Sequence, residues 1–151
     1  MTVDVLTEIV IQRPPAVVAA FASDPDNAPK WYENIKSVEW KSAPGVRVGA
    51  KVAFVAHFLG RRLAYTYEFI EFKPTERLVM RTADGPFAME TSYAWEPIAP
   101  GATRMGLRNR GSPKGFFALM RPFMSAAMRA ANRKDMARLK ALLEASPSTP
   151  R

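Results

Sequence analysis

The stretch RLVMRTADGPFAMETSYAWEPIAPGATRMGLRNR, residues 77–110, contains three runs in which apolar and polar side chains alternate. Alternation of this kind is typical of a β-strand with one buried face. Asp84-Gly85-Pro86 and the segment 97–101 separate the runs, and connections this short join antiparallel neighbours. The stretch therefore predicts an antiparallel meander of strands over residues 76–84, 87–97 and 102–110.

Outward from this meander, the same reasoning predicts strands over residues 3–12, 35–41, 50–59 and 62–73, with a tight hairpin made by Gly60 and Arg61. Pro14 or Pro15 can open a short helix after the first strand, and a second short helix is expected over 27–34. Residues 115–145 predict one long helix, kinked or broken at Pro122. Its apolar side is formed by Phe117, Met120, Met124, Met128, Ala131, Leu139 and Leu142.

Helices and strands are segregated along the chain, which indicates the α+β class. The economical arrangement is a curved antiparallel sheet of about six to seven strands wrapped around the long C-terminal helix. We expect a single domain over residues 1–145, followed by a disordered tail, SPSTPR, at 146–151.

Composition excludes several classes of protein. The chain has 151 residues and no cysteine, which rules out a disulfide scaffold, a thiolate metal site and a cysteine nucleophile. It shows neither a signal peptide nor an apolar run long enough to span a membrane, so a cytoplasmic protein is expected. The net charge of +8 is spread over the sequence and is densest at 129–140. We interpret it mainly as a solvated face, with a peripheral contact with an anionic membrane possible and no specific nucleic-acid binding.

Strand parity predicts which side chains point into the curved sheet. Placing charged residues outside turns a largely apolar and aromatic set inward, with a few hydroxyl groups: Val52, Phe54, Ala56, Phe58, Tyr65, Tyr67, Phe69, Leu78, Met80, Thr82, Thr91, Tyr93, Trp95, Thr103, Met105, Leu107 and Asn109. This is the usual lining of a small-molecule pocket, although a plain filled core has the same composition. Ile70 and Phe72 then face outward unless a bulge shifts the register, and would suit a homodimer contact.

The same parity leaves the interior without a titratable acid or base other than tyrosine. His57, the only histidine, and Glu68 and Glu90 fall on the outer face. No metal ligands have the required spacing, no cofactor motif is present, and no catalytic residue can be assigned. Tyr65, Tyr67 and Tyr93 could still orient a carbonyl or enol.

The order of elements, together with several local signatures, resembles the START-like (SRPBCC) superfamily, in particular its polyketide cyclase/dehydrase branch. The signatures are EIVI (8–11) with PP (14–15), Trp31, YEFIEFKP (67–74), YAWEP (93–97), GATR (101–104) and LKALLE (139–144). The resemblance implies a helix-grip fold with an internal cavity. It also implies binding of a lipid, polyketide or isoprenoid-like molecule by a carrier or binding protein, with a polyketide cyclase or dehydratase that positions its substrate with tyrosine hydroxyls as the alternative.

Combining the resemblance with strand parity gives a predicted ligand-binding set drawn from the second short helix, the strands and the long helix. Its members are Trp31, Phe54, Phe58, Tyr65, Tyr67, Met80, Thr91, Tyr93, Met105, Leu107, Phe117, Met120 and Met124.

Overall fold

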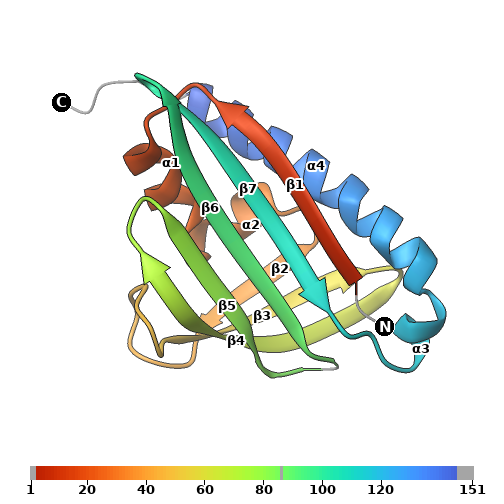
Figure 1. The fold of residues 1–151 in the computed structure, drawn as a ribbon. Coiled ribbons are helices and arrows are strands. Elements are labelled where there is room, and N and C mark those ends of the chain that lie inside the picture. Colours follow the sequence, from red (N-terminus) through yellow and green to blue (C-terminus); the bar gives the residue numbers. More distant parts are fainter. Residues whose placement is uncertain (1–2, 86, 146–151) are drawn as a thin grey trace.

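The computed structural model describes residues 3–85 and 87–145, so the tail expected at 146–151 lies outside the described residues. Seven antiparallel strands form one curled sheet in the order β1-β7-β6-β5-β4-β3-β2 (Figure 1). The strands are β1 Val3–Ile11, β2 Ile35–Trp40, β3 Lys51–Phe58, β4 Arg61–Lys73, β5 Arg77–Asp84, β6 Met89–Ala99 and β7 Ala102–Gly111. The predicted antiparallel meander is confirmed, and β1 forms one edge of the sheet by pairing with β7.

The hairpin between β3 and β4 differs by one residue from the prediction. Phe58 pairs with Arg61, so the turn residues are Leu59 and Gly60. Both have positive φ, 52° and 73° respectively. Two successive positive φ angles define the hairpin turn whose twist matches that of the strands, and glycine adopts this conformation at little energetic cost.

Three short helical segments follow β1 and precede β2. Helix α1 spans Pro15–Ala22, the 3-10 turn η1 spans Pro25–Asn27 and helix α2 spans Ala28–Trp31. Pro14 and Pro15 open α1 as expected, and Asp24 caps η1 by accepting a hydrogen bond from Asp26 N–H at 3.0 Å. The second predicted helix is therefore shorter than 27–34, because the chain is already extended at Tyr32.

The C-terminal helical region is broken, as Pro122 predicts. Helix α3 covers Phe116–Leu119, and the 25-residue helix α4 covers Arg121–Ala145. The break falls at Met120, which places Pro122 in the first turn of α4, where a missing N–H is tolerated. Helix α4 packs along β1 and also contacts α2, so it lies across the open side of the curled sheet (Figure 1).

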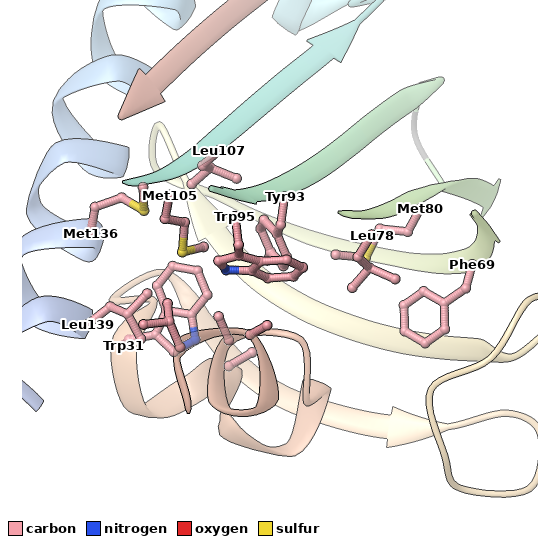
Figure 2. Close-up of a cluster of buried hydrophobic side chains, with 14 of the residues drawn as sticks. Trp31, Phe69, Leu78, Met80, Tyr93, Trp95, Met105, Leu107, Met136 and Leu139 are labelled. Carbon is pink, nitrogen blue, oxygen red and sulfur yellow. The ribbon is translucent and has the colours of Figure 1, made fainter. Parts of the chain in front are cut away.

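The apolar side of α4 is rotated relative to the predicted one at its end. Leu142 is 39% exposed, whereas Leu143 is buried in the core, so the prediction for Leu142 was wrong. Two polar residues, Asn132 and Asp135, are buried on the same side as Met128 and Leu139. Figure 2 shows Met136 and Leu139 of α4 facing Met105 and Trp31 in the core.

A bulge in β4 corrects the expected orientation of Phe72. The pairing of β4 with β5 shifts between Phe69 and Glu71, so that Ile70 is the extra residue. After this shift Phe72 is partly buried and packs against the core cluster that contains Phe69. Phe72 therefore offers no outward apolar contact for a second copy of the chain.

Candidate functional site

A cavity of about 110 Å³ lies between the inner face of the sheet and α4. Strands β3 to β7 supply most of its wall, α4 supplies Met124, Met128 and Ala131 among others, and the region from α1 to β2 supplies the rest. Aromatic and aliphatic side chains dominate the wall, as they do in small-molecule sites. The inward alternation of the strands produces this lining, because every second residue points to the concave face.

The structure brings eight of the thirteen predicted ligand-binding residues to the cavity wall: Phe54, Phe58, Tyr65, Tyr67, Met80, Thr91, Tyr93 and Met124. It places the other five elsewhere. Trp31, Met105 and Leu107 are fully buried in the core without reaching the wall, Phe117 belongs to a second apolar cluster with Phe87, and Met120 lies at the junction of α3 and α4. Contact of any of these residues with a ligand stays a prediction.

Seven polar residues on the wall are absent from the predicted ligand-binding set: Ser23, Asp24, Tyr32, Asn34, Asn109, Asn132 and Asp135. Asp135 is 2% exposed, which corrects the expectation of an interior without a titratable group other than tyrosine. Parity could not find Asn132 and Asp135, because it was applied to strands and both residues lie on α4. The available signal is their helical spacing from Met128 and Leu139, which places all four on one side of the helix.

A chain of hydrogen bonds crosses the sheet on the cavity side. The Thr91 hydroxyl donates to Asn109 Oδ1 at 2.9 Å and lies 3.0 Å from the Tyr67 hydroxyl. Because the single Thr91 proton is used toward Asn109, the Tyr67 hydroxyl is the donor to Thr91. Burial raises the pKa of Tyr67 to about 12, so this phenol stays protonated at neutral pH.

A second polar group joins α2 to the sheet. The hydroxyl oxygens of Tyr32 and Tyr93 are 2.6 Å apart, a short hydrogen bond in which one phenol donates to the other. Burial raises the pKa of both tyrosines, and the negative charge of Asp135 raises it further. Both phenols are therefore neutral, and the acceptor of the pair keeps its own proton for donation to a third group.

Asp135 is the one carboxyl group buried against this apolar wall in the described part of the chain. Burial raises its pKa from 3.8 to about 6. The Glu33 backbone N–H, which donates to Asp135 Oδ1 at 3.1 Å, and the charge of Arg138 act in the opposite direction. The Glu33 carboxylate raises the pKa slightly more. Asp135 is therefore mostly ionised at pH 7 and becomes protonated in mildly acidic solution.

Asn132 lies one helical turn before Asp135 and is 5% exposed. Its Nδ2 group has no hydrogen-bond partner among the described residues. A buried donor without a partner is energetically costly, and such groups in native proteins call for an explanation.

The basic charge of the protein lies elsewhere. The described wall includes no lysine, arginine or histidine, and its only charged side chains are Asp24 and Asp135. On the outer face of the sheet, arginines pair with acids, as in Arg108 with Asp4 at 2.6 Å and Arg104 with Glu96 at 2.6 Å. His57 is exposed at the outer surface and Glu68 is half-buried, and neither lines the cavity.

Residues 3–85 and 87–145 contain neither a cluster of metal ligands nor a membrane-spanning helix. No three histidine, cysteine, aspartate or glutamate side chains come close enough together there to hold a metal ion. Within the same residues, no helix is both long enough and apolar enough to cross a membrane.

Solved structures with this architecture include several bacterial proteins. TTHA0849 from Thermus thermophilus is 21% identical to the chain, with a TM-score of 0.79 and coverage of 94% of this chain and 97% of that one. The Zhui aromatase/cyclase from Streptomyces is 12% identical, with a TM-score of 0.81 and coverage of 95% and 94%. A START superfamily protein from Mycobacterium smegmatis is 12% identical, with a TM-score of 0.76 and coverage of 94% and 97%. At these identities the similarity shows the helix-grip fold.

No curated protein matches the chain in sequence. The sequence profile of one family, described as polyketide cyclase / dehydrase and lipid transport, matches residues 2–144 and so covers nearly the whole chain. The chain therefore belongs to the polyketide cyclase/dehydrase and lipid-transport family.

Proposed function

We propose that the protein binds a hydrophobic small molecule in the cavity beneath α4 and acts as a binding protein or carrier. The observation that carries this proposal is the apolar and aromatic cavity itself, which side chains leave unfilled. Well-packed interiors leave few voids larger than a water molecule, so an apolar space of this volume is unusual for a plain core. The fold and the family, whose description includes lipid transport, support the same reading.

The size of the cavity limits what enters without rearrangement. An apolar cavity of about 150 Å³ can hold benzene, so about 110 Å³ suits a small ring or part of a longer molecule. Larger ligands, including a two-ring molecule such as naphthalene, require the wall to move. Four methionines, Met80, Met89, Met124 and Met128, line the cavity, and their unbranched side chains adapt to different shapes more readily than other apolar residues.

Filling the cavity tests the proposal. Ala131 of α4 lies on the wall, whereas the neighbouring Ala130 is exposed and does not line the cavity. Ala131→Phe is expected to weaken binding of naphthalene by about tenfold or more, because the added ring occupies ligand space. Ala130→Phe adds the same ring outside the cavity and should bind like the wild type. Calorimetric titration measures both, with circular dichroism to verify folding; equal affinities for the two folded variants contradict the assignment.

The alternative function is a cyclase or dehydratase of the polyketide type, favoured by the paired hydroxyls of Tyr32 and Tyr93 on the cavity wall. Neutral phenols can hold a carbonyl or enol oxygen in a reactive position without transferring charge. The two functions are distinguished by whether the protein converts its ligand chemically. In the presence of a binding protein, a poly-keto compound reacts no faster than it does in buffer alone. A cyclase instead releases a product with a different mass or ring pattern.

A further inference from the structure

The two polar residues of α4 at the cavity define the chemistry of one end of the ligand, if the proposed function holds. Asn132 and Asp135 are three residues apart on one helix, which makes their side chains neighbours. Both line the cavity and both are at least nine-tenths buried. Asn132 Nδ2 presents a donor without a partner, and Asp135 presents a carboxylate whose only hydrogen bond from the described residues comes from Glu33 N–H.

We propose that the cavity selects an uncharged apolar molecule that carries a hydroxyl group, and that this hydroxyl binds between Asn132 and Asp135. A hydroxyl is the smallest group that accepts one hydrogen bond and donates another. It would accept from Asn132 Nδ2 and donate to the Asp135 carboxylate. Phenols, enols and alicyclic alcohols share this chemistry.

Charge excludes the acidic alternatives. Of the 22 lysines and arginines in the chain, none lies on the described wall, so no cation is placed to neutralise a carboxylate or phosphate head inside the cavity. Asp135 would repel such a group directly, and Glu33 adds negative charge nearby, offset in part by Arg138. The site therefore disfavours fatty acids and phosphate esters, although the protein as a whole is strongly basic.

An ammonium group is also disfavoured. It could pair with Asp135, but it has no lone pair to accept from Asn132 Nδ2 and would leave that donor unpaired. A buried ion pair must also overcome the desolvation of both charges. The adjacent Tyr32 and Tyr93 hydroxyls are neutral and suit a second oxygen on the same ligand better than a charge.

Four naphthalene probes test the inference by titration calorimetry at neutral pH. Naphthalene measures apolar binding alone, 2-methoxynaphthalene adds an acceptor, 2-naphthol adds an uncharged hydroxyl and 2-naphthoate adds a negative charge. The wild type is expected to bind 2-naphthol about tenfold more tightly than 2-methoxynaphthalene, and 2-naphthoate most weakly. Equal affinities for 2-naphthol and 2-methoxynaphthalene, or tight binding of 2-naphthoate, would overturn the inference.

Two variants assign the selectivity to the named residues. Asn132→Leu is expected to remove the preference for 2-naphthol while naphthalene still binds. Asp135→Asn keeps an acceptor for Glu33 N–H and should raise the affinity for 2-naphthoate by about tenfold. A hydroxyl preference that survives Asn132→Leu, or exclusion of 2-naphthoate that survives Asp135→Asn, contradicts the assignment. Failure of all four probes, naphthalene included, would instead refute the proposed function on which the inference rests.

Discussion

Asp135 occupies a position that stability alone does not favour. A carboxyl group buried beside tyrosines and methionines loses hydration, and its pKa rises from 3.8 to about 6 for that reason. The folded protein therefore holds this proton more tightly than the unfolded chain does. Ionising the group destabilises the fold: the penalty is absent below about pH 4, grows as the pH passes through 6 and is complete above it.

Replacing this carboxyl should consequently stabilise the protein at neutral pH. Asp135→Asn is expected to raise the free energy of unfolding at pH 7 by on the order of 2 kcal/mol, with little difference from the wild type at pH 4. Urea denaturation at several pH values measures this. Glu76→Gln removes a negative charge from an exposed position and serves as the control. A gain that does not vary with pH would show that burial of the charge is not its cause.

The sequence could not have indicated this buried carboxyl by composition. Asp135 is preceded by Arg133 and Lys134, both exposed, and such a run usually forms a solvated helix face. What decides its burial is the rotation of α4 against the sheet. The helical spacing of Asp135 from Met128 and Leu139 is the one local signal of that rotation, and packing between residues more than a hundred positions apart fixes it.

At the scale of elements, the strands were predictable and the helix end was not. Strand parity has a period of two, so one charged residue fixes the orientation of all others, and Thr91, Tyr93 and Trp95 are buried as expected. The β4 bulge at Ile70 breaks that parity and reverses Phe72. In a helix, Leu142 and Leu143 are separated by only 100°, so either could complete the apolar side.

The two leucines provide a direct test of how α4 sits. Leu143→Ala is expected to destabilise the fold by about 2–4 kcal/mol, because it removes a buried side chain and leaves a void in the core. Leu142→Ala, at a position that is 39% exposed, should cost less than about 1 kcal/mol. Chemical denaturation compares them; similar losses, or the reverse order, would mean that the helix is rotated.

In the molecule as a whole, the basic residues and the cavity occupy different regions. Basic residues cover the outside, often paired with acids across β1, β7 and β6, whereas every polar group on the described, mostly apolar cavity wall is either acidic or neutral. The family resemblance and the helix-grip fold could be predicted from the order of helices and strands along the sequence. The polar end of the cavity was not, because it forms only where α2, α4 and the sheet meet. Contact with an anionic membrane and a homodimer stay predictions.

We expect this cavity, and no other part of the core, to take up an apolar ligand, and methionine-methyl NMR during titration with 2-naphthol can locate the bound molecule. Met80, Met89, Met124 and Met128 line the cavity, whereas Met105 and Met136 are fully buried in the core away from the wall. We predict saturable changes in chemical shift at the first four methyl groups and little change at Met105 and Met136. The absence of any saturable change, or changes centred on Met105 and Met136, would show that this cavity does not bind the ligand.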